Sequence, residues 1–564
     1  MKYLATLLGV LALGSSGQPQ GAPLKPPNIL LIVVEDLSAR VGAFGDPVAR
    51  TPNIDDMAAD GVRFTRVFAT SGVCAPSRAA LITGMYQQAI GAQHMRTSSF
   101  GRERSGELGT FSTPGPPYEA VPPEYVKAFP ELLRAAGYFT MNNAKTDYQF
   151  GDPFTVWDVS GNDVTLADRD PNKPFFFMLS NNTTHESGLF REGFANTLDN
   201  SAELVARNNS RLARLDVSTD PAVVSVPGFL PDTPEVRRDI ARLYDNVRLM
   251  DDWVGDVVKQ VQAAGLRDDT IIIWTTDHGD GLPRGKRSIY DSGLHVPFVI
   301  RFPDKAGAGT INARLVSFVD IAPTLLALAG APIPDYMHGR DFLDDTVSPR
   351  DYVHAARDRL DELPDRSRAV RDTRFKYIRN YVSDRPQLGP LYYRENIATM
   401  AEIRRLHRNG ELTPVIAAYV ENARPAEELY DLATDPDEVS NVVDDPAYRE
   451  ALERLRAELD RWLEAVGDLG VMSEADMIGR MWPDGVQPQT VIPDIGFECG
   501  NGRATVVLRA VTPGSSLGWR IAGSEGWSLY TSPQPVDPGT AIEAKAIRYG
   551  FRESSVRSRV SAGC

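Results

Sequence analysis

A cysteine at the start of an apolar helix is the most reactive group that this sequence places in a defined setting. Cys74 opens the segment CAPSRAALITG, in which Pro76 and the apolar residues behind it predict a helix beginning near the cysteine. The positive end of the helix dipole favours an anionic group beside Cys74, and Arg78 adds a cation one turn further on. The residues alone leave two interpretations open, an inert buried thiol or a site for chemistry on an anion.

Acidic and imidazole side chains end two other apolar runs. The run 27–35 stops at Glu35 and Asp36, and the run 270–275 is followed by Asp277 and His278. Runs without alternation are typical of strands buried on both faces, and ligands of open α/β sheets bind at the carboxyl ends of such strands. The carboxylates are oxygen donors suited to Ca²⁺ or Mg²⁺. The alternative is that these side chains only cap the turn after each strand. Their occurrence at the ends of two strands disfavours that interpretation.

The elements around these groups alternate between strand and helix. Predicted strands lie at 27–35, 138–141, 175–179, 270–275 and 296–300, and predicted helices lie at 51–60, 130–136 and 235–264. This order predicts an α/β fold with a mostly parallel central sheet.

The pattern changes after about residue 370. Strands at 375–378 and 428–432 and an amphipathic helix at 447–465 predict a smaller α+β subdomain, and short strands such as 504–510 and 541–547 predict a small β-sandwich. We expect four parts: a signal peptide at 1–22, a catalytic domain at 23–370, a C-terminal subdomain at 371–482 and an accessory module at 490–564.

Composition limits the classes of function. The 564 residues carry a formal net charge of −15, which argues against a nucleic-acid-binding surface but permits an anionic substrate in a locally positive pocket. Lys2, the apolar stretch 4–13 and the small residues after it predict export to the periplasm or beyond the cell, and no later segment reads as a membrane span. Of three cysteines, Cys499 and Cys564 flank the tail and can pair, which leaves Cys74 single.

The segment from Cys74 to Gly84 resembles the signature of the formylglycine-dependent sulfatases, Cys-x-Pro-Ser-Arg followed by Leu/Ile-Thr-Gly. Four further segments agree with that family: 27–30 (PNIL), 51–55 (TPNID), 276–279 (TDHG) and 319–324 (VDIAPT). The resemblance covers about residues 27 to 467. It is closest to the branch of bacterial polysaccharide sulfatases and heparan N-sulfatases.

The resemblance implies an alkaline-phosphatase-like core and a nucleophile made from Cys74. In the family this cysteine is oxidised to formylglycine by a formylglycine-generating enzyme or an anaerobic maturase, and the hydrated aldehyde attacks the sulfur of a sulfate ester. It also implies a Ca²⁺ site, with Mg²⁺ as the alternative ion, formed by Glu35, Asp36, Asp277 and His278 beside Cys74. Glu35 and His278 depart from the Asp and Asn that the family commonly has there.

The resemblance further implies how sulfate is bound and a proton transferred. Arg78, Lys145 and Lys286 match the cations that neutralise sulfate, and His185 matches a histidine that assists proton transfer. Asp147 stands where the family has a second histidine.

Four residues are predicted substrate contacts: Asp147, Arg287, His94 and His295. For the two histidines a structural role is an equal alternative.

The predicted function is therefore hydrolysis of the sulfate esters, or of the N-sulfates, of a sulfated carbohydrate, without nucleic acid or a membrane span. Two alternatives stay open: a phosphonate or phosphate-ester hydrolase with the same nucleophile, and an exported glycan-binding protein without activity. In the tail, Trp519, Trp527 and Tyr530 are a possible sugar-stacking face, although at least one of them is expected in the core.

Overall fold

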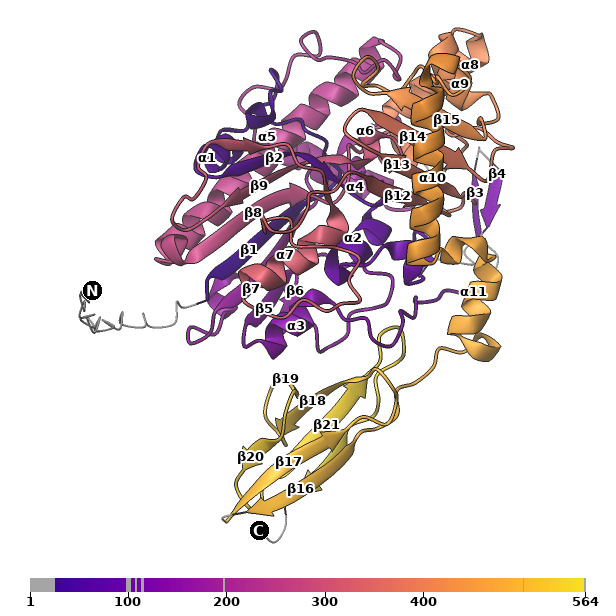
Figure 1. The fold of residues 1–564 in the computed structure, drawn as a ribbon. Helices are drawn as coiled ribbons and strands as arrows, with labels where there is room; N and C mark the ends of the chain where they lie inside the picture. The colour runs from indigo at the N-terminus through magenta and orange to yellow at the C-terminus, as the bar shows by residue number, and fades with distance from the viewer. Residues whose placement is uncertain are drawn as a thin grey trace, which may run out of the picture.

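The computed structural model describes residues 26–97, 103–106, 109–112, 116–195, 198–500 and 502–561. Figure 1 shows a large sheet covered by helices, a second sheet with helices beside it, and a separate all-β tail. The predicted signal peptide at 1–22 lies outside the described residues. Within them, no helix combines the length and the apolar character that crossing a membrane requires.

The central sheet has the strand order β10-β2-β9-β8-β1-β7-β5-β6, with β11 beside β2. Its strands are β1 (Asn28–Val34), β2 (Val62–Phe68), β5 (Phe139–Asn143), β6 (Val159–Gly161), β7 (Phe175–Asn181), β8 (Thr270–Thr276), β9 (His295–Arg301), β10 (Thr310–Asn312) and β11 (Val316–Ser317). From β8 to β6 neighbouring strands are parallel, whereas β9 runs antiparallel to both β8 and β2. The predicted α/β fold with a mostly parallel sheet is confirmed.

Strand β1 shows why its sequence is apolar throughout. Leu30, Ile32 and Val34 pack into one hydrophobic core, and Ile29, Leu31 and Val33 pack into the core on the opposite face. Helices α1 (Pro52–Ala59) and α5 (Pro234–Ala263) contribute to the first core, and helices α2 (Cys74–Thr83), α3 (Phe129–Ala135) and α7 (Ile321–Leu328) to the second (Figure 1). Of two further helices, α4 (Ser201–Leu212) follows β7 in the chain and α6 (Asp291–Leu294) directly precedes β9.

The second sheet belongs to the C-terminal subdomain. Its order is β12 (Val353–Arg357), β13 (Ser367–Arg371), β14 (Phe375–Asn380) and β15 (Glu427–Asp431), all antiparallel. Leu455 and Leu459 of α10 (Arg449–Val466) pack against Tyr377 and Leu429 of this sheet. The predicted division between residues 370 and 371 falls inside β13, so β12 and most of β13 lie on the N-terminal side of it. The remaining elements are α8 (Ala398–Asn409), α9 (Pro414–Val420), α11 (Glu474–Met481) and a hairpin of β3 (Glu103–Gly106) and β4 (Gly109–Ser112).

The tail consists of two antiparallel sheets around a small apolar core. One contains β16 (Asp494–Gly500), β17 (Arg503–Arg509) and β20 (Gln534–Val536), and the other β18 (Ser516–Ile521), β19 (Ser528–Leu529), β21 (Ala541–Ile547) and β22 (Arg557–Val560). Trp519 and Tyr530 pack against this core, whereas the Trp527 ring lies 6.0 Å from the ring of Phe154, outside the tail, with the two rings tilted by 59°. These three aromatic residues therefore do not form one free face. The proposed pairing of Cys499 with Cys564 involves a residue outside the described part of the chain.

The tail is anchored to α3 beside the central sheet by buried and partly buried polar contacts. The Tyr549 hydroxyl donates to Glu131 at 2.9 Å, and the Ser516 hydroxyl donates to the other carboxylate oxygen of Glu131. Arg134 donates to the carbonyl of Trp527 at 2.9 Å. Because these contacts fix side chains from both parts, the tail is held at a defined place beside α3 (Figure 1).

Candidate active site at the carboxyl end of the central sheet

Strand register brings the predicted polar groups to one edge of the sheet. Val34, the last residue of β1, pairs with Asn181 of β7 and with Thr276 of β8, so the three strands end level. Glu35-Asp36 and Asp277-His278 therefore leave the sheet side by side. The turn is tight: Asp36 adopts a left-handed backbone conformation with φ 50°, which is costly for most residues and less so for Asp.

Cys74 is the first residue of α2 and its side chain is fully buried. Its sulfur lies 3.3 Å from Nε2 of His278 and 3.9 Å from Oδ1 of Asp36. The Ser77 hydroxyl donates to the backbone carbonyl of Asp277 at 2.6 Å, which ties the first turn of α2 to the end of β8. The positive end of a ten-residue helix is thus directed at the edge of the sheet.

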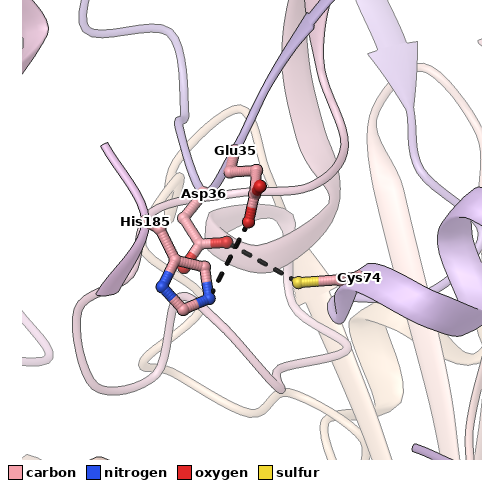
Figure 2. Close-up of side chains that lie close together, drawn as sticks. All are labelled: Glu35, Asp36, Cys74 and His185. Carbon is pink, nitrogen blue, oxygen red and sulfur yellow. Dashed lines mark hydrogen bonds and ion pairs between the residues drawn. The ribbon is translucent and has the colours of Figure 1, made fainter. Parts of the chain in front are cut away.

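Two overlapping groups of side chains have donor atoms within 4.8 Å of one another. They are Glu35, Asp36, Cys74 and His185 in one group and Asp36, Cys74, Asp277 and His278 in the other. Figure 2 shows the first group converging, with the Cys74 sulfur opposite the Asp36 carboxylate. The His278 ring donates from Nδ1 to the Gly279 carbonyl at 3.0 Å, so Nε2 is the nitrogen that faces the cluster.

Each of the three carboxylates in the cluster forms an ion pair with a lysine or an arginine. The pairs are Lys286 with Asp36 at 2.7 Å, Lys145 with Glu35 at 2.8 Å, and Arg78 with Asp277 at 3.1 Å. Burial would lower the pKa of Lys145, but Cys74 and Glu35 hold that pKa above its usual value. The structure therefore brings Arg78, Lys145 and Lys286 together, and keeps all three charged.

One guanidinium nitrogen of Arg78 has no hydrogen-bond partner in the part of the chain that the structure describes. Its Nε donates to Asp277, and its Nη1 donates to the Ser180 hydroxyl at 3.2 Å. Its Nη2 is buried and has no hydrogen-bond partner among the described residues. Buried donors in native proteins are satisfied, so this nitrogen marks a place where an oxyanion can bind.

His185 contacts Lys286 of the cluster and also lines a surface cleft. Its Nε2 accepts from the Lys286 ammonium at 2.9 Å, and its Nδ1 lies 2.9 Å from the Ser187 hydroxyl. Burial, followed by the charges of Lys286 and Lys145, holds the pKa of His185 well below its usual value. The ring is therefore neutral near pH 7, and Nε2 accepts because the Lys286 ammonium can only donate, while the Ser187 backbone N–H lies 3.3 Å from Nδ1.

Glu186, which is fully buried, and Asp361, which is partly buried, are two carboxylates beside the cluster that the sequence analysis did not identify. Arg287 donates to both carboxylate oxygens of Glu186 at 2.8 Å and to Asp361 at 2.9 Å. Glu186 also lies 3.3 Å from Lys286. Arg287, a predicted substrate contact, is thus engaged by two internal carboxylates. The only sequence signal for Glu186 is its position directly after His185.

Asp147 lies beside the cluster, with its carboxylate 3.6 Å from the Lys145 amine. Its backbone is left-handed, with φ 60°, and its side chain is partly exposed. An acidic group therefore occupies the position beside Lys145 at which the family resemblance predicts an imidazole.

The structure does not bring His94 and His295 into this cluster. His94 accepts from the Arg359 amide at 3.3 Å, and burial lowers its pKa to about 4. His295 donates to the Thr65 carbonyl at 2.8 Å and stacks on Phe68. Both rings are satisfied by internal partners, in line with the structural alternative.

A cleft of about 480 Å³ opens next to the cluster. It is lined by Glu35, Lys145 and His185 on the side of the cluster, and by residues that include Asn182, Arg207 and Tyr393 further out. This volume lies in the range of sites that take small organic ligands.

Comparison with known proteins identifies two matching family models. The sulfatase model matches residues 27–331, and the model named N-sulphoglucosamine sulphohydrolase, C-terminal, matches residues 284–396. An ulvan-active sulfatase of Formosa agariphila is 41% identical over 551 residues, which cover 94% of this chain and 90% of the relative.

Solved structures agree on the fold. A 2-O GAG sulfatase has a TM-score of 0.55 at 21% identity and covers 80% of this chain and 94% of its own. A phosphonate monoester hydrolase of Agrobacterium radiobacter has a TM-score of 0.52 at 20% identity and covers 78% and 96%. One fold thus serves sulfate and phosphonate esters, and the fold alone does not choose between them.

Proposed function

Because the chain belongs to the sulfatase family and is a sulfuric ester hydrolase, we propose that it releases sulfate from a sulfated carbohydrate through an aldehyde formed at Cys74. One observation carries this proposal. Cys74 lies at the head of α2, within 4 Å of both His278 and Asp36, in a buried cluster whose Arg78 keeps an unpaired nitrogen.

Conversion of Cys74 to formylglycine explains why a cysteine stands at this point. The hydrated aldehyde supplies two hydroxyls on one carbon, one to accept the sulfuryl group and one whose deprotonation expels sulfate again. A serine or an unmodified cysteine lacks the second hydroxyl and would stay sulfated. The proposal therefore includes a maturase, either a formylglycine-generating or an anaerobic enzyme, as a partner of the newly made chain.

The cluster also fits a divalent cation. Glu35, Asp36 and Asp277 provide carboxylate oxygens, and His278 directs Nε2 into the same space. Since Lys145, Lys286 and Arg78 already balance these three carboxylates, a bound Ca²⁺ or Mg²⁺ would leave the pocket positive, as a sulfate ester anion requires. Such an ion would lower the pKa of the hydroxyl nucleophile beside it.

The protein's own cations and histidine account for the remaining roles. Arg78 offers its free Nη2 to a sulfate oxygen, and Lys145 and Lys286 lie close enough to neutralise the same group. The hydrogen bond between Lys286 and Nε2 of His185 holds a proton that can pass to the departing oxygen.

We propose a sulfated polysaccharide as the substrate class. The ulvan-active relative, which matches this chain along nearly its whole length, supports this choice. Export to the periplasm or beyond the cell fits a polymeric substrate and remains a prediction from the first residues of the sequence.

A screen of sulfated saccharides tests the proposal. The mature enzyme from its own host is offered fragments of ulvan, heparan sulfate and carrageenan, together with an aryl sulfate, an aryl phosphate and an aryl phosphonate, and sulfate or phenol release is measured. We expect sulfate release from at least one saccharide. Preferential cleavage of the phosphorus esters would favour the alternative hydrolase, and no turnover of any compound would favour a binding protein.

A further inference from the structure

The outer wall of the cleft next to the cluster is formed by α4. Arg207 of this helix, Asn182 and Tyr393 line the same cleft as Lys145 and His185. At about 480 Å³ the cleft extends beyond the catalytic groups. A saccharide whose sulfate reaches Arg78 would therefore run outward past these residues.

Helix α4 and the turn after it carry three arginines at spacings that place them on one side. Arg207, Arg211 and Arg214 are four and three residues apart, so their charges are neighbours. Arg207 and Arg214 are exposed and Arg211 is half-buried. Burial and the charges of Arg207 and Arg214 lower the pKa of Arg211, so the three cations repel one another.

No carboxylate relieves this repulsion within the described ranges. Arg211 donates to the amide oxygen of Asn182 at 3.0 Å, and Arg214 donates to the carbonyl of Arg211. By contrast, Arg237 and Arg248 of the neighbouring α5 each pair with an aspartate. An unneutralised group of cations at a cleft is unusual in a chain of net charge −15, and it creates a local positive potential for anionic ligands.

We propose that Arg207, supported by Arg211, binds an anionic group on the sugar next to the one that carries the scissile sulfate. The enzyme would then select a polyanionic saccharide over a singly sulfated one. The bound group is a carboxylate or a second sulfate, which share the oxyanion chemistry that a guanidinium recognises. Asn182 holds Arg211 in place, and Tyr393 supplies an aromatic ring to the same cleft. This inference rests on the proposed sulfatase function.

The test compares two probes in four enzymes. The probes are the saccharide fragment that releases sulfate fastest in the screen above and an aryl monosulfate without a second anion. The enzymes are the wild type, Arg207→Ala, Arg207→Lys and the control Arg408→Ala, which removes an exposed arginine of α8 that is not among the residues lining the cleft. For each enzyme the ratio of kcat/KM on the fragment to kcat/KM on the aryl sulfate is measured.

We expect Arg207→Ala to lower this ratio about tenfold, the loss of one charge-assisted contact, mainly through KM on the fragment. Arg207→Lys should restore part of the ratio, and Arg408→Ala should match the wild type. A ratio that stays at the wild-type value in Arg207→Ala would overturn the inference.

Carboxyl reduction of the fragment identifies the anion. If a uronate is bound, reduction lowers the wild-type ratio as far as Arg207→Ala does, and the variant loses nothing further. If a second sulfate is bound, reduction leaves the ratio unchanged and the effect of the variant persists. Sulfate release from the fragment with a ratio that Arg207→Ala leaves unchanged would refute this inference alone, whereas release from none of the saccharides would refute the proposed function itself.

Discussion

Glu186 is expected to be as important for the site as the residues that the sequence identified. It has no solvent exposure, and its carboxylate accepts two 2.8 Å hydrogen bonds from Arg287 and lies 3.3 Å from Lys286. The substitution Glu186→Gln keeps the shape but removes the charge. It also turns one acceptor into an NH₂ group that faces the donors of Arg287.

The structure sets the size of the effect. Removing one partner of a buried ion pair typically costs 3–5 kcal/mol, roughly, because a charge is left without compensation. Here Arg287 keeps Asp361 at 2.9 Å, and Lys286 keeps Asp36 at 2.7 Å. We therefore expect the lower end, a loss of about 3 kcal/mol in the free energy of unfolding. Because Lys286 contacts both Asp36 and His185, kcat should also fall, by about 10- to 100-fold.

Urea unfolding followed by tryptophan fluorescence, together with sulfate release, measures both effects. The matched control is Glu464→Gln on the exposed side of α10, which should change stability by less than about 0.5 kcal/mol. If Glu186→Gln unfolds at the wild-type midpoint and retains wild-type kcat, the assignment of Glu186 as the shared counter-ion of Arg287 and Lys286 is refuted.

Three further predictions concern the nucleophile, the cation and the pH dependence of stability. Cys74→Ala should abolish turnover while leaving the circular dichroism spectrum and the unfolding midpoint close to those of the wild type; residual wild-type activity would exclude the mechanism. Exhaustive chelation should remove activity, and added Ca²⁺ or Mg²⁺ should restore it; an unchanged rate after chelation would argue against a cation at Asp36 and Asp277. Burial lowers the pKa of His338 from 6.5 to about 4, so below pH 6.5 the unfolded chain binds a proton that the folded chain rejects, and stability falls as the pH drops from 6.5 to 4. His338→Gln should remove up to about 3 kcal/mol of this acid sensitivity, and equal pH profiles of unfolding for both proteins would contradict it.

The strands of the core and the residues at their ends could be predicted because both follow from local sequence. The uninterrupted apolar run before Glu35 implies a strand buried on two faces, and β1 does contribute to two cores. Parallel strands that end level then place Glu35 beside Asp277 without knowledge of the detailed packing. Cys74 could be placed because the proline and the apolar residues behind it define a helix start.

The rest depends on contacts between distant segments. Glu186 meets Arg287 across 101 residues, and Ser516 of the tail meets Glu131 across 385. Neither pair has a periodic pattern or a motif that links its members. His295 follows the Asp277-His278 pair in sequence, but it begins β9, which pairs with β2, and its ring packs there on Phe68. Residue type alone could not show that this ring has internal partners.

The modification state of Cys74 in the organism's own protein tests the central claim most directly. The enzyme is purified from its native host, digested, and the peptide that contains residue 74 is analysed by mass spectrometry. The account predicts that active enzyme carries an aldehyde, or its hydrate, in place of the thiol. Active enzyme in which every copy of this peptide retains an unmodified thiol would contradict it.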